Sequence, residues 1–255
     1  MRNIITIAAK ELRSYFVSPI AYIVLAVFGL VFGIFFTVSV ESFIRYVLAQ
    51  GQMGGNVGLD LHDTLISRLM GTINTIGLFL VPMITMRLFA EEKRTGTIEL
   101  LLTSPIQDYE IVLGKWLAAV AFYLALLLVS ALNFAVLLYL SNPEWKPILV
   151  GYLGLFLTGS ATLALGTFIS TTTKNQIIAV AVTFFACLGL WIIDAVTVFN
   201  TGAWAQVVGY LSLISHFGDF SRGLLQLKDV VFYVTFTFFW LFLSVRSIES
   251  LRWRS

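Results

Sequence analysis

The sequence is poor in the charged residues that cover the surface of a soluble protein. Asp, Glu, Lys and Arg make up 12% of its 255 residues, whereas soluble domains carry about 25%. The formal net charge of +2 is too small to indicate a nucleic-acid partner. Low charge therefore excludes an ordinary soluble domain and a nucleic-acid-binding protein.

Residues for metal, disulfide or nucleotide chemistry are equally scarce. Cys187 is the one cysteine, which excludes an internal disulfide framework and a zinc site built on cysteines. His62 and His216 are the two histidines, and they lie too far apart in the sequence to indicate a metal site. No G-x-x-x-x-G-K-[ST] run is present, because Gly114-Lys115 lacks both the earlier glycine and the following hydroxyl residue. We expect no catalytic residue, metal or cofactor on this chain.

Long apolar stretches are what the sequence has instead. Hydrophobic residues make up 58% and the mean hydropathy is +0.91. Six stretches contain no charged residue: 20–40, 69–86, 116–140, 148–170, 177–193 and 230–245. Segments of roughly 17–25 apolar residues match the thickness of a bilayer core. The sequence therefore predicts an all-α polytopic membrane protein with spans at 20–40, 69–88, 116–140, 148–170, 177–198 and 229–245. The first stretch lacks an A-x-A site, which favours a retained span over a cleaved signal peptide.

The distribution of Lys and Arg predicts the orientation. With the amino terminus inside, eleven of the 16 Lys and Arg residues fall in inside segments and five in outside segments. Cytoplasmic loops carry an excess of these residues. Both termini are therefore expected in the cytoplasm, which agrees with an even number of spans.

Residues 3–17 have the pattern of an amphipathic helix. At 100° per residue, one face carries most of the apolar side chains, with Ile7 as the exception. These are Ile4, Ile5, Ala8, Leu12, Tyr15 and Phe16. Ser18-Pro19 is expected to break this helix before the first span. The pattern fits a simple lipid anchor, or a helix that steers the first span and contacts a cytoplasmic partner.

Two segments predicted outside differ in character. Residues 41–68 contain four glycines between positions 51 and 58, which suits a flexible loop. Residues 203–222 begin too apolar for a solvated loop yet have too short an apolar run to span, so a re-entrant hairpin is expected. Within it, Asp219 and Arg222 have the spacing of a helical salt bridge.

The inside segment between the second and third spans is the most informative. Residues 92–103 combine mixed charge with a short apolar run, which predicts one short surface helix. Ile98, Leu101 and Leu102 share a face at i, i+3, i+4 spacing, so lipid headgroups or another protein must cover it. Ser104-Pro105 followed by Gln107 is typical of a helix start, which predicts that the next helix begins at Pro105.

Three patches resemble the permeases of ABC-2 type transporters. The first is Glu92-(x)3-Gly96-Thr97-Ile98-Glu99-Leu100-Leu101 with Ser104-Pro105 and Leu113-Gly114-Lys115. The second is Lys10-Glu11-Leu12-(x)2-Tyr15-Phe16-(x)-Ser18-Pro19-(x)-Ala21-Tyr22, and the third is Leu211-Ser212-(x)3-His216-Phe217-(x)2-Phe220-(x)-Arg222-Gly223. They extend over nearly the full length. They most resemble the branch of gliding-motility-associated permeases, with the nitrous-oxide-reductase accessory permeases as near relatives.

The resemblance implies a role for each patch. Residues 92–103 would be a coupling helix that docks on a separate cytoplasmic ABC ATPase subunit, present in two copies and holding ATP and Mg. The expected contact residues are Glu92, Gly96, Thr97, Ile98, Glu99, Leu101, Leu102 and Pro105. The connecting helix would use Lys10, Glu11, Arg13, Tyr15 and Phe16, and the outer hairpin Ser212, His216, Arg222 and Gly223.

The resemblance also implies partners and a location. Six spans would be half a transporter, so a second permease copy or a homologue is expected, in a bacterial inner membrane. An accessory membrane-anchored protein on the outer side is a further partner that the family allows, although nothing in residues 41–68 indicates it. Small residues in the fourth span, such as Gly154 and Gly159, fit either close approach between copies or packing within the chain.

The expected function is therefore that of a permease subunit of an ATP-driven exporter. Two alternatives remain. An ATPase-driven assembly or motility component would transport nothing, and an ion-coupled carrier would act alone. The carrier is disfavoured because such proteins place ionisable residues within their spans, and the six charge-free stretches have none.

Overall fold

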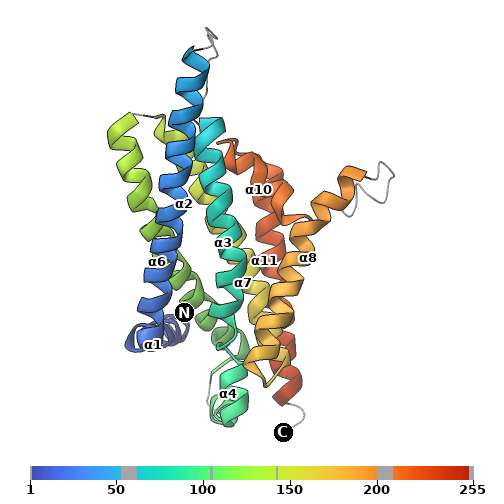
Figure 1. Ribbon diagram of the computed structural model, residues 1–255. Helices are drawn as coiled ribbons and strands as arrows, with labels where there is room; N and C mark the ends of the chain where they lie inside the picture. Colours follow the sequence, from blue (N-terminus) through green and yellow to red (C-terminus); the bar gives the residue numbers. More distant parts are fainter. Residues whose placement is uncertain (1, 53–61, 104–105, 142, 200–208, 253–255) are drawn as a thin grey trace.

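The computed structural model describes residues 2–52, 62–103, 106–141, 143–199 and 209–252, and in these ranges all regular structure is helical (Figure 1). The helices are α1 (Arg2–Val17), α2 (Pro19–Gln52), a π-helical turn η1 (His62–Ile66), α3 (Ser67–Thr85), α4 (Ala90–Thr95), α5 (Ile98–Leu102), α6 (Asp108–Ser141), α7 (Trp145–Thr172), α8 (Gln176–Phe199), α10 (Leu213–Ser221) and α11 (Leu227–Arg252). Six segments of the described chain are long and apolar enough to cross a membrane. The predicted all-α polytopic fold is therefore confirmed.

Several helices are longer than the predicted spans. α2 continues to Gln52, so the first part of the predicted flexible loop 41–68 is helical instead. The glycines at 54, 55 and 58 lie outside the described residues. α2 has 34 residues, which rise about 51 Å. These helices thus extend beyond the charge-free stretches of the sequence, because helical backbone hydrogen bonds form both inside the bilayer and outside it.

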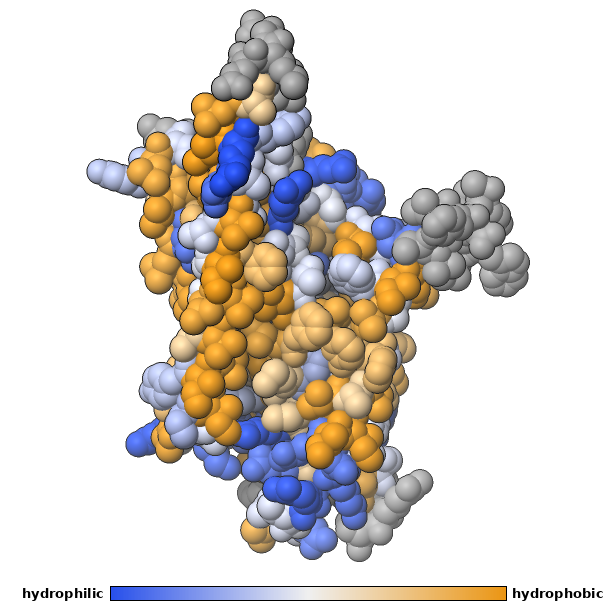
Figure 2. All heavy atoms as spheres, in the orientation of Figure 1, coloured by the Kyte–Doolittle hydropathy of each residue, from blue (hydrophilic) through white to orange (hydrophobic). Residues whose placement is uncertain are grey.

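The two ends of the bundle differ. Both described chain ends, α1 and α4 lie at one end, which we call the terminal end, and α10 lies toward the other, the distal end (Figure 1). Arg252 of α11 forms an ion pair of 3.2 Å with Asp108 of α6 at the terminal end. Apolar residues cover the middle of the face in Figure 2, and hydrophilic residues gather at the terminal end. This arrangement suits a bilayer around the middle.

α7 is the central helix of the bundle. It packs against α3, α6, α10 and α11, and it is the most buried of the six candidate spans. Its glycines lie directly under side chains of its neighbours: a Cβ at Gly154 would lie 2.4 Å from Phe220, and one at Gly166 would lie 2.4 Å from Thr85. The small residues of the fourth span therefore serve packing within the chain.

α1 lies against the protein more than the sequence predicts. Ser18 separates it from α2, and α1 packs along α6. Ile7, the expected exception to the apolar face, contacts Gly114, where a Cβ would lie 2.7 Å from its Cγ2. Tyr15 stacks on Phe122 of α6, and Phe16 contacts the same ring edge-on. The expectation of an apolar face directed at lipid is corrected in part, because Leu12, Tyr15 and Phe16 pack against the core of the protein, whereas Ile5 is 68% exposed.

Gly159→Ala tests the packing of α7. Its Cβ would lie 2.1 Å from a ring carbon of Tyr123, so we expect the free energy of unfolding to fall by about 1–3 kcal/mol. The matched control is Gly189→Ala in α8, where the new Cβ would meet no atom of a packing neighbour within 4 Å. Thermal unfolding in detergent measures both. Equal midpoints for the two variants would contradict the packing described here.

Candidate functional site

The segment between α3 and α6 forms two short helices instead of the one helix predicted over 92–103. Gly96 has a φ of +76° and ends α4, and α5 begins two residues later. A left-handed residue after a helix is usually glycine, since it has no Cβ to clash with the backbone. The Thr95 and Thr97 hydroxyls lie 2.9 Å apart across this turn. Gly96 therefore sets the angle between α4 and α5.

α4 is attached to the end of α7. The Ser170 hydroxyl accepts hydrogen bonds from the backbone N–H groups of Phe89 and Ala90, at 3.1 and 3.2 Å. It thus caps the amino-terminal end of α4, which has no side-chain cap of its own. Lys93 donates to the Thr171 carbonyl. Sequence reasoning missed this cap, because Ser170 lies about 80 residues away in the chain.

A buried lysine links α1, α4 and α6. The Lys115 ammonium lies 3.1 Å from Glu11 Oε1 of α1 and 2.8 Å from Glu92 Oε1 of α4. The Lys115 side chain is 2% exposed, and those of Glu11 and Glu92 are 18% and 17% exposed. The ammonium also lies over the face of the Phe89 ring, 5.2 Å from the ring centroid, which is a cation–π contact. A buried charge needs such partners, so Lys115 fixes three helices to one another.

This cluster includes two acidic residues of the predicted site. Glu92 was expected on an ATPase contact surface and Glu11 on a connecting helix, yet both carboxylates face inward to Lys115. Tyr15 is also internal: its hydroxyl donates to the Ile84 carbonyl at 3.1 Å, and burial raises the pKa of this hydroxyl. Lys10 and Arg13 of α1 are exposed.

The predicted apolar stripe on residues 92–103 is also corrected. Ile98 and Leu101 are half-buried and pack against the main core, whereas Leu100 is 74% exposed. The side chain of Leu102, and Pro105, lie outside the described residues. Six exposed residues form what we call the α4–α5 outer surface: Arg94, Thr95, Gly96, Thr97, Glu99 and Leu100. Of the expected contact residues, Gly96, Thr97 and Glu99 lie on this surface.

α6 begins at Asp108, three residues after the predicted start at Pro105. The Gln107 carbonyl accepts from the N–H groups of Glu110 and Ile111, at 2.9 and 3.3 Å. Glu110 Oε2 in turn accepts from the Gln107 N–H at 3.4 Å and from the Asn3 side chain of α1 at 3.0 Å. Glu110 therefore caps the start of α6 and also holds α1.

The described part of the predicted outer hairpin, residues 209–222, is a turn followed by α10 at the distal end. Ser212 caps α10, accepting from Ser215 N–H at 3.3 Å. His216 Nδ1 lies 2.6 Å from Asp229 Oδ1, and its Nε2 lies 3.0 Å from the Tyr210 carbonyl. Both ring nitrogens of His216 thus have an oxygen partner, one from α11 and one from the turn before α10. Residues 203–208 of the prediction lie outside the described residues.

The end of α10 depends on Gly223. It has a φ of +76°, and a Cβ there would lie 2.5 Å from Pro147. Asp219 forms its ion pair with Lys228, at 3.4 Å, instead of the predicted pair with Arg222. At the end of α10, the Arg222 backbone N–H donates a hydrogen bond to the Asp219 carbonyl. The hairpin patch therefore has a structural role at the distal end.

Among the described residues no group of three or more His, Cys, Asp or Glu gathers as metal ligands do. What the described part offers is a helical bundle that suits a membrane, with a braced, exposed helical surface at its terminal end. These features define a polytopic all-α membrane protein.

Comparisons place this bundle in a family. Residues 5–244 match the family model described as ABC-2 family transporter protein, so the chain belongs to the ABC-2 transporter permease family. It is 26% identical over 192 residues to the "Probable multidrug ABC transporter permease YbhR" of Escherichia coli strain K12, covering 72% of this chain and 49% of that protein. The same figures hold for YbhR of Escherichia coli O157:H7. The chain thus spans about half the length of the curated relatives it matches.

Lys115→Met tests the buried cluster. Glu11 and Glu92 then lose their counter-charge, so we expect the free energy of unfolding to fall by about 2–4 kcal/mol. The matched control is Lys228→Met, whose ion pair is 56% exposed on the lysine side and worth less than about 1 kcal/mol. Thermal unfolding measures both. Adding Glu92→Gln to Lys115→Met should recover stability, and a further loss of stability would overturn the assignment.

Proposed function

We propose that this chain is the membrane-spanning permease subunit of an ABC exporter that a separate ATPase subunit drives. Membership of the ABC-2 transporter permease family supports this function. The single structural observation that carries it is the α4–α5 outer surface, which is exposed on one side and braced from behind by Lys115 and Ser170. Export as the direction is supported by the description of the matched relatives as multidrug transporter permeases.

The bracing suits α4 and α5 to transmit a movement. Lys115 connects α4 to α6 and α1, and Ser170 with Thr171 connects it to α7. A push on α4 would therefore displace the ends of three other helices with it. Rigid-body displacement of packed helices is one of the common ways in which a local event changes a whole protein between two states.

We infer that the ATPase binds the α4–α5 outer surface. Leu100 offers an apolar contact, and Arg94 and Glu99 offer charges of both signs. Glu92, Ile98 and Leu101 support this surface from inside instead of touching the partner. In this proposal ATP and Mg are held by two copies of the ATPase subunit, and this chain contributes no catalytic group.

A second permease copy or a homologue would complete the transporter. α2 and α8 are the least buried candidate spans, each with 17% of its most apolar window buried, so they are the helices that a second copy or lipid must cover. The proposal places the chain in a bacterial inner membrane with the terminal end in the cytoplasm. The gliding-motility branch and an accessory protein on the outer side stay predictions from the sequence resemblance.

Charge reversal tests the docking surface. We expect Glu99→Lys, and separately Leu100→Asp, to weaken association with the cognate ATPase by about tenfold, as loss of a central interface residue does. Glu144→Lys is the matched control, an exposed reversal just before α7 at the distal end. Co-purification from membranes and titration of the purified ATPase measure the effect. Undiminished binding by both variants would remove the proposed role of the surface.

ATP-dependent transport separates an exporter from an assembly component. In vesicles that contain the permease and its ATPase, we expect ATP-dependent movement of a fluorescent drug, and its loss in Glu99→Lys. An ATPase-driven assembly component would bind the ATPase and move nothing. Movement of the drug without any ATPase would identify a carrier that acts alone.

Single-cysteine labelling tests the orientation. The one cysteine, Cys187, is buried, so Glu99→Cys and Glu144→Cys in a Cys187→Ala background give one exposed thiol each. A membrane-impermeant maleimide added to spheroplasts should label only Glu144→Cys, and inverted vesicles should give the reverse. Labelling of Glu99→Cys in intact spheroplasts would place the docking surface outside and exclude a cytoplasmic ATPase as its partner.

A further inference from the structure

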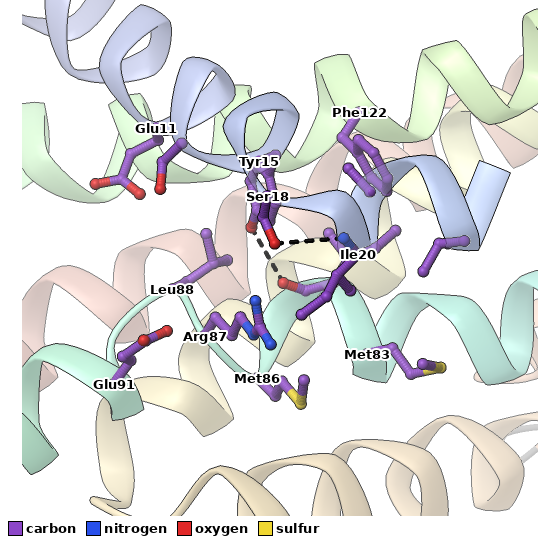
Figure 3. A pocket seen from close by; sticks show the side chains of 14 residues that line it. Glu11, Tyr15, Ser18, Ile20, Met83, Met86, Arg87, Leu88, Glu91 and Phe122 are labelled. Atoms are coloured by element: carbon purple, nitrogen blue, oxygen red, sulfur yellow. Dashed lines mark hydrogen bonds between the residues drawn. The ribbon is translucent and has the colours of Figure 1, made fainter.

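A cavity of about 170 Å³ lies at the terminal end, between α1, the start of α2 and the end of α3 (Figure 3). It is separate from the α4–α5 outer surface. One part of its wall is polar and the other apolar. Its volume is several times the volume of about 30 Å³ that a single water molecule occupies in the liquid, so it has room for a chemical group larger than water.

The polar part of the cavity carries both signs of charge. Arg87, from the turn after α3, points into the middle of the space, and Glu91 of α4 lies at its edge (Figure 3). Within the described part of the chain, neither the Arg87 guanidinium nor the Glu91 carboxylate has a hydrogen bond or ion pair. Both side chains are half-buried. A guanidinium in such a place is suited to bidentate binding of a phosphate.

The apolar part of the cavity belongs to the membrane-spanning helices. Ala21 and Val24 of α2, Met83 of α3 and Phe122 of α6 line it. Met83 and the neighbouring Ile20 are exposed, so the cavity opens on the surface that the candidate spans turn outward. A ligand that fits both parts has a head with an anion and a cation, and an apolar body that extends beside α2 and α3.

We propose that this cavity binds a phospholipid with a primary ammonium head, of the phosphatidylethanolamine type. The phosphate binds Arg87, the ammonium donates hydrogen bonds to Glu91, and the acyl chains lie against Val24 and Met83. Phosphatidylcholine has no N–H to donate to Glu91, and phosphatidylglycerol has no cation for it. The inference does not depend on the proposed function, because it needs neither an ATPase nor transport.

Such a lipid would bridge α1, α2 and α3 next to the Lys115 cluster. Tyr15, which lines the same cavity, already bonds the Ile84 carbonyl and closes its inner wall (Figure 3). The site thereby joins the bilayer to the helices that hold α4. Lipid composition would then affect the stability of the terminal end.

Native mass spectrometry of the full chain in detergent tests the assignment. The probes are phosphatidylethanolamine, phosphatidylglycerol and phosphatidylcholine of the same acyl chains, and soluble glycerophosphoethanolamine. We expect phosphatidylethanolamine to be retained about tenfold better than the other two lipids, since it alone satisfies both charges. Soluble glycerophosphoethanolamine should bind more weakly than the lipid. Equal retention of all three lipids, or equal binding of the soluble head group, overturns the proposal.

Two variants locate the site. Arg87→Gln should lower retention of phosphatidylethanolamine about tenfold. Glu91→Gln, at a half-buried position, should abolish the preference over phosphatidylglycerol while leaving phosphatidylglycerol retention equal or higher. Arg94→Gln and Glu99→Gln, exposed residues of α4 and α5 outside the cavity, are the matched controls and should retain the wild-type preference. An unchanged preference in Glu91→Gln overturns the proposal even if Arg87→Gln fails to fold.

Discussion

The terminal end of this protein is organised around one buried ammonium group. Lys115 is withdrawn from water almost completely, and its charge requires carboxylates within hydrogen-bond distance. Glu11 and Glu92 meet that requirement from segments 104 and 23 residues away in the sequence. Glu11 belongs to α1 and Glu92 to α4. The need of the Lys115 ammonium for carboxylate partners therefore helps to determine where α1 and α4 lie.

The rest of the terminal end is consistent with that arrangement. Ser170 caps α4 from the end of α7, and Glu110 holds Asn3 of α1 while it caps α6. α7 is in turn held in the centre of the bundle by close contacts at its glycines. The short helices therefore form one unit with the spans, which is what a part that transmits force between a partner and the membrane requires.

The distal end is stabilised differently. There the His216–Asp229 pair, the Tyr210 carbonyl and stacked aromatic rings hold α10 against α11. These contacts form a compact internal network, whereas the terminal end presents an exposed surface and a cavity lined by Arg87 and Glu91, for which the described residues provide no ion-pair partner. The contrast supports the proposals that partners and lipid act at the terminal end.

The sequence by itself determined the fold class, the six spans and the family, because long charge-free stretches and short motifs are local properties of the chain. It also located the segment between the second and third spans as the candidate site. Local patterns were less reliable for boundaries: the single helix at 92–103 is divided at Gly96, and α6 starts at Asp108.

Only the tertiary structure decided which side chains of that segment face outward. Amphipathic spacing suggested that Ile98 and Leu101 form an exposed stripe, and the family resemblance suggested that Glu92 contacts a partner. Spacing defines a face without saying what lies opposite it. The opposing groups here are Lys115, Ser170 and the core of the bundle, all distant in the chain. The burial of the Lys115 charge and of the amino-terminal end of α4 therefore determined which residues form the α4–α5 outer surface. No local sequence pattern could show this.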